Sequence, residues 1–244
     1  MTERLYAIGD IHGAPDRMQD AIDRIEQDGG RDARIVFLGD YVDRGPQSRE
    51  VIEFLMEGLA KGRNWICLLG NHDRMFSMFM EDYPRTDKHL PVGYHWFHER
   101  IGGVETLESY GVAIAEKERI ENIHQRARAV VPQEHLNFLD SLHYSHQEGD
   151  CLFVHAGIRA GVPLEQQDKD DLVWIRDGFL DDRTEHPFLV VHGHTPVDEA
   201  THFGNRIALD TGCGYGHPLM PAVFEGRDCW ILTDKGREPL LPIK

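Results

Sequence analysis

The chain has 244 residues, of which 41% are hydrophobic, so it is long enough and apolar enough to bury a sizeable core. Lysine and arginine contribute 26 positive charges against 42 negative charges from aspartate and glutamate, which leaves a net charge of −16. This charge opposes binding to nucleic acid and to anionic membranes, and no apolar stretch approaches the length of a membrane span. We therefore expect a globular protein without a nucleic-acid or membrane partner. A phosphate-bearing substrate would need a local positive centre, which a metal could supply.

The N-terminal segment and the cysteines favour a cytoplasmic protein. Residues 1–8 run directly into an apolar segment, without the basic region and long apolar region of a secretory signal. The four cysteines are far apart and include no C-x-x-C pair. We expect all four to be reduced thiols rather than disulfides. They are Cys67, Cys151, Cys213 and Cys229.

Five short apolar runs, each rich in β-forming residues, are followed at once by a polar motif that contains glycine. In chain order they are residues 4–8 before GDIHG, 35–38 before GDYVDRG, 65–69 before GNHD, 151–154 before HAG and 188–191 before HGHTP. Continuous apolar runs of this length, bounded by glycine, are typical of buried strands. The first three motifs lie roughly thirty residues apart, which is the length of a strand–helix–strand unit.

Two amphipathic helices are expected between the first three strands, because apolar residues there recur with helical spacing. The apolar positions are Met18, Ala21, Ile22 and Ile25 after Pro15, and Val51, Ile52, Leu55 and Leu59 after Pro46. The first half of the chain therefore reads β-α-β-α-β, which implies largely parallel pairing. In such sheets the polar residues beyond the carboxyl ends of the strands meet at one edge, where ligands bind.

Between about residues 83 and 146 the strand signals fade while the density of charge and histidine rises. Leu136, Leu139 and Leu142 predict an amphipathic helix after Pro132. We expect a mostly helical insertion over the active-site edge of the sheet, within a single domain of residues 1–244. Residues 94–98 (YHWFH) either line a substrate groove or pack inside this insertion, and packing is favoured. Further strands are expected at 206–209, 222–224 and 229–232, with the last two antiparallel.

Six polar residues of the kinds that bind metals occur in order, each directly after a predicted strand. They are Asp10, His12, Asp40, Asn71, His155 and His194. Each alone could be a turn residue, a helix cap or a core histidine, but such residues have no reason to recur at one topological position. Carboxylate, imidazole and amide oxygen suit Mn²⁺, Fe or Zn²⁺. Six ligands exceed one tetrahedral site, so we expect two ions bridged by a carboxylate, with Asp40 as the candidate.

Together the motifs GDIHG, GDYVDRG, GNHD, HAG and GHTP resemble those of the calcineurin-like metallophosphoesterases. They are most similar to the phosphoprotein phosphatase branch, especially its bacterial and bacteriophage lambda members. Pro196 supports this branch, because relatives outside it have a further histidine ligand there. The motifs span Gly9 to Pro196, and the segment LDTGCGYG from Leu209 also resembles the family's closing segment. The resemblance implies an α/β fold: a metallophosphoesterase β-sandwich flanked by helices.

The resemblance also implies roles for the motif residues. The first metal is bound by Asp10 and His12, the second by Asn71, His155 and His194, and Asp40 bridges them. His72 matches the general acid, Asp43 the carboxylate that orients it, and Arg44 and Arg176 (in WIRD) the phosphate-binding arginines. The expected cofactors are two divalent ions, Mn²⁺ first with Fe or Zn²⁺ as alternatives, and a bridging hydroxide attacks phosphorus in line. His192 is left over, either at the metal site or in packing.

These features predict a metal-dependent phosphatase for phosphomonoesters, with phosphoserine and phosphothreonine proteins as the leading substrates. The alternative enzyme is a dinucleoside tetraphosphate hydrolase, which shares most of the motifs. Two features favour the phosphatase: Asp43, where those hydrolases usually have alanine, and the short segment between His155 and His194. A third alternative is a catalytically inactive metal-binding scaffold, but such a scaffold would not need His72, Asp43 and Arg44.

Overall fold

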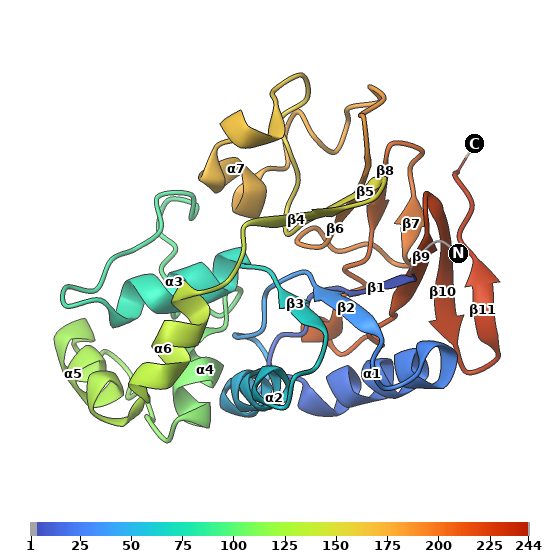
Figure 1. The fold of residues 1–244 in the computed structure, drawn as a ribbon. Helices are drawn as coiled ribbons and strands as arrows, with labels where there is room; N and C mark the ends of the chain where they lie inside the picture. Colours follow the sequence, from blue (N-terminus) through green and yellow to red (C-terminus); the bar gives the residue numbers. More distant parts are fainter. Residues whose placement is uncertain (1–3, 244) are drawn as a thin grey trace.

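The computed structural model describes residues 4–243, which form two β-sheets packed face to face between helices (Figure 1). The six-stranded sheet has the order β11-β10-β9-β1-β2-β3, and the five-stranded sheet has the order β4-β5-β6-β8-β7. The strands of the first sheet are β1 (Leu5–Ile8), β2 (Arg34–Phe37), β3 (Trp65–Cys67), β9 (Ala222–Glu225), β10 (Asp228–Thr233) and β11 (Gly236–Pro239). Those of the second are β4 (Ser145–Glu148), β5 (Cys151–Val154), β6 (Leu189–His192), β7 (Thr201–His202) and β8 (Arg206–Ala208). This confirms the predicted α/β sandwich.

Parallel pairing is confirmed where the motifs predicted it. β1 pairs in parallel with β2 and β2 with β3, while β5 pairs in parallel with β6 and β6 with β8. The predicted crossover helices are α1 (Pro15–Gly29) and α2 (Ser48–Ala60), and each begins close to a proline. The strands β9 and β10 pair antiparallel, as expected. The carboxyl ends of the parallel strands therefore define one edge in each sheet.

The strand side chains alternate between two cores because successive residues of a strand point to opposite faces. In β1, Leu5 and Ala7 lie in the core between the sheets, whereas Tyr6 and Ile8 belong to the core under the helices. Opposite β1, Phe153 and Val191 of the second sheet fill the same inter-sheet core. A third, smaller cluster covers the outer face of the second sheet. The central strands are thus buried on both faces, which explains their continuous apolar runs.

The remaining helices gather mainly between β3 and β5. They are α3 (Asn71–Met80), α4 (Gly103–Ser109), α5 (Ile120–Val130), α6 (Gln133–Asp140) and α7 (Lys169–Trp174). Helices α4, α5 and α6 lie beside α3 and α2 at one end of the molecule (Figure 1). The helix predicted after Pro132 is α6, but the region expected to be helical up to residue 146 already enters β4 at Ser145. Within residues 4–243 no helix has the length and hydropathy needed to cross a membrane.

Candidate metal centre and active site

The six predicted metal ligands come together between the carboxyl edges of the two sheets. Asp10 and His12 follow β1, Asp40 follows β2, Asn71 begins α3 just beyond β3, His155 follows β5 and His194 follows β6. All six are buried. Nε2 of His155 is 2.9 Å from Oδ1 of Asn71, and the rings of His155 and His194 are 5.1 Å apart. The carboxylate of Asp10 is in neither close group of possible ligands, but it accepts the backbone N–H of His194 at 3.1 Å.

The backbone at this site is held in an unusual conformation. Six non-glycine residues of the described chain have a positive φ, and five of them are candidate site residues: His12, Asp40, Asp43, Arg44 and His194. Such left-handed backbone is uncommon outside glycine, and when surrounding structure enforces it, it marks functional sites. Gly70 and Gly193 complete the turns, because a Cβ on Gly70 would collide with Asp40 and one on Gly193 with Asp10.

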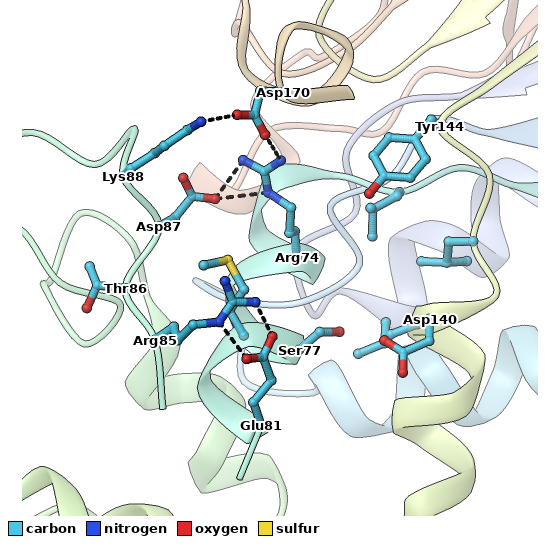
Figure 2. A pocket seen from close by; sticks show the side chains of 14 residues that line it. Arg74, Ser77, Glu81, Arg85, Thr86, Asp87, Lys88, Asp140, Tyr144 and Asp170 are labelled. Atoms are coloured by element: carbon cyan, nitrogen blue, oxygen red, sulfur yellow. Dashed lines mark hydrogen bonds and ion pairs between the residues drawn. The ribbon is translucent and has the colours of Figure 1, made fainter. Parts of the chain in front are cut away.

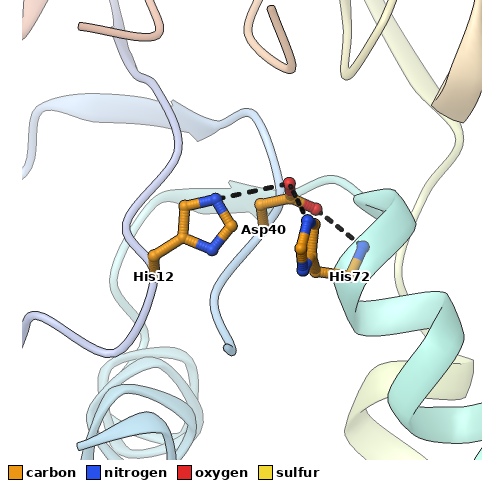
Figure 3. Close-up of side chains that lie close together, drawn as sticks. All are labelled: His12, Asp40 and His72. Carbon is orange, nitrogen blue, oxygen red and sulfur yellow. Dashed lines mark hydrogen bonds and ion pairs between the residues drawn. The ribbon is translucent and has the colours of Figure 1, made fainter. Parts of the chain in front are cut away.

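Asp40 lies between two groups of possible ligands (Figure 3). Its Oδ2 is 3.6 Å from Nε2 of His12 and 4.0 Å from Nε2 of His72. Its Oδ1 is 3.4 Å from Nε2 of His155, which forms the second group together with His194. One carboxylate thus presents a different oxygen to each group, which is one arrangement a bridging carboxylate can adopt.

Hydrogen bonds to backbone carbonyls orient two of the histidines toward the centre. Nδ1 of His12 lies 2.8 Å from the carbonyl of Val42, and Nδ1 of His155 lies 2.8 Å from the carbonyl of Leu38. Because a carbonyl only accepts, each Nδ1 carries the proton and each Nε2 keeps its lone pair for the site. Burial lowers the pKa of His155 to about 4, so the ring is neutral, as a metal ligand requires.

The donor set fits divalent cations. Burial raises the pKa of Asp10, the neighbouring carboxyl groups of Asp210 and Asp40 raise it further, and burial raises the pKa of Asp40 to about 7. So many carboxyl groups in one buried place repel one another unless a cation lies among them. Two buried atoms here, Nε2 of His194 and Oδ2 of Asp210, also have no hydrogen-bond partner. Unsatisfied buried ligand atoms of this kind are what a metal ion would engage.

His72 and Asp43 form a buried pair beside the metal ligands. Nδ1 of His72 donates to Oδ2 of Asp43 at 2.7 Å. The carboxylate of Asp43 also accepts hydrogen bonds from Thr106 Oγ1 (2.7 Å) and Trp96 Nε1 (2.9 Å). The aromatic segment 94–98 therefore contributes a buried, packed side chain that supports the site, in line with the packing interpretation.

Both predicted phosphate-binding arginines reach the site. Arg44 contacts Nε2 of His12 and donates to Nε2 of His72 at 3.1 Å. Arg176 donates to the carbonyl of His194 at 3.4 Å. Burial and then the charge of Arg44 lower the pKa of His72 well below its ordinary value, so its ring is neutral. The two guanidinium groups thus border the centre from different segments of the chain.

Other residues behave differently from the sequence-based expectations. His192 is in neither group of possible ligands; its Nε2 accepts from Arg206 at 3.0 Å and its ring packs on Phe179, which is the packing alternative. Asp210 was not predicted, although it follows the expected strand 206–209 just as the motif residues follow theirs. Asp73 was weighed only as part of a helix N-cap cluster, and its carboxylate does accept the backbone N–H of Gly70 at the start of α3. It also accepts the backbone N–H groups of Asp40 and Tyr41, both at 2.8 Å, and so joins two motif loops.

A cavity of about 490 Å³ lies along α3, and residues 85–88, the end of α6 and Asp170 also line it (Figure 2). Arg74, the residue after the GNHD motif, pairs there with Asp87 (2.7 Å) and with Asp170 of α7 (2.7 Å). Lys88 binds the second oxygen of Asp170 at 2.6 Å. These ion pairs attach the loop after α3 to α7 and neutralise the cations that line the cavity.

Comparison with known proteins identifies the class to which this fold and site belong. Residues 3–220 match the calcineurin-like phosphoesterase model, so the chain belongs to that family and is a metallophosphoesterase, as the motifs predicted. A curated relative from Halalkalibacterium halodurans, named bis(5'-nucleosyl)-tetraphosphatase PrpE (asymmetrical), is 27% identical over 259 residues. The match covers 97% of this chain and 96% of the relative.

Two solved structures share the fold. One, titled a putative diadenosine tetraphosphatase, has a TM-score of 0.63 at 20% identity, with 99% of this chain and 95% of that chain covered. The other, a cold-active protein-tyrosine phosphatase from a psychrophilic Shewanella, has a TM-score of 0.65 at 18% identity, with 99% and 81% covered. At these identities the structures establish the fold alone.

Proposed function

We propose that this metallophosphoesterase hydrolyses dinucleoside polyphosphates, cleaving a dinucleoside tetraphosphate into unequal products. The observation that carries this proposal is the match with the Halalkalibacterium halodurans tetraphosphatase over nearly the full length of both chains. The relationship favours the alternative enzyme over the protein phosphatase that the motifs alone put first. Asp43 does not oppose it, because a carboxylate that orients His72 can serve any leaving group.

The site residues take the roles that their positions suit. Asp10, His12, Asp40, Asn71, His155 and His194 would hold two divalent ions, with Asp40 shared between them. When bound, such ions supply positive charge to the phosphoryl oxygens and lower the pKa of an attacking water. Manganese is the first candidate, with iron or zinc as alternatives.

The protein's own side chains would bind the phosphoryl group and move a proton. Arg44 and Arg176 donate to its oxygens, where negative charge spreads in the transition state. An anionic phosphoryl group draws the Arg44 guanidinium away from His72 and raises the pKa of that ring. His72, held by Asp43, can then donate a proton to the leaving oxygen as the P–O bond breaks.

A product assay tests the proposed function. Metal-stripped protein is given Mn²⁺ and diadenosine tetraphosphate, and the nucleotides are separated by chromatography. We expect ATP and AMP in equal amounts, no turnover without metal, and a higher kcat/KM than for phosphoserine peptides under the same conditions. Equal release of two ADP molecules would overturn the unequal cleavage, and no hydrolysis of the dinucleotide would overturn the substrate class.

A phosphomonoesterase acting on phosphoserine or phosphothreonine is the second candidate. The buried His72–Asp43 pair favours it, because an alkoxide leaving group needs a proton far more than a nucleotide phosphate does. A higher kcat/KM for phosphopeptides than for diadenosine tetraphosphate would support this candidate and leave the assigned metal ligands unchanged.

A further inference from the structure

A cavity of about 330 Å³ adjoins the candidate centre on the side of Arg44. It shares His12 and Arg44 with the centre and continues along the first turn of α1 to the turn that contains Cys213. The cavity therefore borders the candidate centre at these two side chains. Neither the proposed metal ligands nor the proposed proton donor accounts for this space beyond His12.

The cavity is lined by two guanidinium groups, those of Arg17 and Arg44, that form no direct salt bridge with a carboxylate of the described residues. Arg17 donates to the carbonyl of Cys213 at 2.7 Å, which aims its side chain along the cavity wall. Among residues 4–243, neither Arg17 nor Arg44 forms a salt bridge, whereas Arg24, two turns further along α1, pairs with Asp234 at 2.9 Å. In a chain with a net charge of −16, two such cations beside one cavity indicate a site for an anion.

An exposed aromatic ring lies beside the cavity, on the residue between the lining residues Gly214 and Gly216. Tyr215 is 59% exposed, and one face of its ring lies 4.8 Å from the guanidinium carbon of Arg44. Tyr83, far along the chain in the loop after α3, is the other aromatic residue among the exposed large hydrophobic residues that the structure describes. An aromatic ring left in solvent beside a cationic cavity is suited to stack on a nucleobase.

We propose that this cavity and Tyr215 form a subsite for a nucleoside diphosphate group that extends from the phosphoryl group at the metal centre. Arg17 binds the second phosphate and Tyr215 stacks on the base. The exposed carboxylate of Asp16, on the same wall, can accept hydrogen bonds from ribose hydroxyls. The role of the subsite in binding a dinucleotide substrate rests on the proposed function. The short segment between His155 and His194 favoured the phosphatase because it leaves little chain to hold a dinucleotide. The subsite would hold the dinucleotide elsewhere.

Competition among three probes tests each part of the subsite. The reaction is hydrolysis of 4-nitrophenyl phosphate by the full chain with excess Mn²⁺, and the competitors are phosphate, methylenediphosphonate and the α,β-methylene analogue of ADP. Each inhibition constant is divided by that of phosphate in the same variant, so losses of turnover cancel. We expect wild-type protein to bind the diphosphonate about tenfold more tightly than phosphate, and the nucleotide analogue about tenfold more tightly again.

The variants separate charge from stacking. Arg17→Ala is expected to remove the advantage of both diphosphate probes, and Arg17→Lys to restore part of it. Tyr215→Ala is expected to weaken the nucleotide analogue alone by about tenfold, while Tyr215→Phe, which keeps the ring, retains it. Arg31→Ala and Tyr83→Ala are matched controls, because both side chains are exposed and neither lines this cavity, and they should leave every ratio unchanged. Thermal melting of each variant and calorimetric titration of the analogue check folding and direct binding.

Two results would overturn the subsite: a wild-type protein that binds the nucleotide analogue no better than phosphate, or ratios that Arg17→Ala and Tyr215→Ala leave unchanged. The subsite and the proposed function fail separately. If diadenosine tetraphosphate is not hydrolysed but the ratios change as expected, the subsite stands and the substrate class is wrong. If the dinucleotide is hydrolysed and the ratios do not change, the nucleotide is held elsewhere.

Discussion

At the scale of single residues, Asp40 connects the two groups of candidate ligands. Its Oδ1 also accepts the backbone N–H of His72 at 2.9 Å, so the carboxylate is fixed from the side of α3. An amide at this position would keep the shape and much of the hydrogen bonding while removing the charge that two cations share. Replacement of this carboxylate by an amide therefore tests the two-ion arrangement directly.

Asp40→Asn is expected to reduce the bound Mn²⁺ from two ions per chain and to lower turnover at least about a hundredfold. Elemental analysis after gel filtration measures the metal, and 4-nitrophenyl phosphate measures turnover. Asp20→Asn, an exposed change on α1, serves as the control. Two tightly bound ions with normal turnover in Asp40→Asn would show that this carboxylate does not bridge.

His72 lies close enough to Asp40 to be either a metal ligand or a proton donor. If it is the donor, His72→Asn keeps both ions and loses about 10²–10⁴-fold in kcat on an alkyl phosphate. The loss on 4-nitrophenyl phosphate should be smaller, because that leaving group needs less protonation. Loss of one ion, or equal losses on both substrates, would remove the general-acid role.

Thr106 influences the pKa of Asp43, the hydrogen-bond partner of His72. Burial raises the pKa of Asp43 well above its ordinary value, and the hydrogen bonds from Thr106 and Trp96 lower it. Thr106→Val removes one of these donors, so the pKa of Asp43 rises and its carboxyl group stays protonated to higher pH. The acidic limb of the kcat profile should therefore move to higher pH, with about a tenfold loss at pH 7. An unchanged limb would mean that ionisation of Asp43 does not control turnover.

At the scale of elements, Arg74 fastens α3 to the loop that follows it and to α7. Its side chain is only 14% exposed and that of Asp87 only 2%, so their ion pair is well shielded from solvent (Figure 2). The nearby pair between Arg85 and Glu81 is exposed on both sides and joins two residues of the loop after α3. The two pairs in one cavity provide a matched comparison.

Arg74→Met is expected to lower the free energy of unfolding by about 1–3 kcal/mol, because it leaves buried carboxylate without its cation. Arg85→Met should change it by less than about 0.5 kcal/mol, since exposed ion pairs contribute little. Urea unfolding followed by circular dichroism gives both values. Equal effects of the two changes would show that burial does not set the strength of the Arg74 pairs.

The sequence predicted the central strands and missed the edges. The five motif strands are continuous apolar runs because they are buried on both faces, and that pattern is visible without a structure. By contrast, β4 (SHQE) is a half-buried edge strand and β11 (GREP) a mostly exposed one, and their polar residues give no apolar run. The strand β7 has only two residues. Helix α3 was not predicted, because the GNHD motif dominates its start.

For a related reason, the sequence predicted the candidate metal ligands but not the residues that support the site. Residues that follow a buried strand are marked by their place in the chain, and the structure brings all six of these predicted ligands together. Trp96 and Thr106 carry no such mark: they lie in a segment without motifs and reach Asp43 only through the packing of α4. Contacts between distant segments depend on tertiary packing, which a single sequence does not reveal.

At the scale of the whole molecule, Asp28 joins three parts of the chain. It lies in the last turn of α1, accepts from Tyr6 of β1 at 2.7 Å, and forms a two-pronged pair with Arg237 of β11, both at 2.7 Å. Hydrogen bonding to Arg237 holds the pKa of Asp28 below its usual value. A carboxyl group with a lowered pKa in the folded state stabilises the fold above its unfolded pKa and loses this contribution as pH falls.

Asp28→Asn should therefore destabilise the protein by about 1 kcal/mol at pH 7. The difference from wild type should shrink as pH falls from about 4 through the lowered pKa. Urea unfolding at a series of pH values measures this difference. If the difference in unfolding free energy stayed constant down to pH 2, the charge of the Asp28 carboxylate would not be what stabilises its contacts with Tyr6 and Arg237.

Because the chain returns to the first sheet after α6, residues 81–142 form a segment that could be exchanged between relatives. The backbone carbonyl of His143 accepts the N–H of Leu69 at 2.8 Å, and the backbone N–H of His143 donates to the carbonyl of Cys67 at 3.1 Å. Residues 81–142 therefore leave and rejoin the fold beside one strand. A segment that leaves and returns at one place is a natural unit to exchange between relatives. It is not freely interchangeable, however, because its apolar side chains belong to the core under the helices and because it brings Trp96 and Thr106 to Asp43. In a hybrid whose donor segment lacks counterparts of these two residues, we expect Asp43, and with it the proposed proton donor His72, to be misaligned.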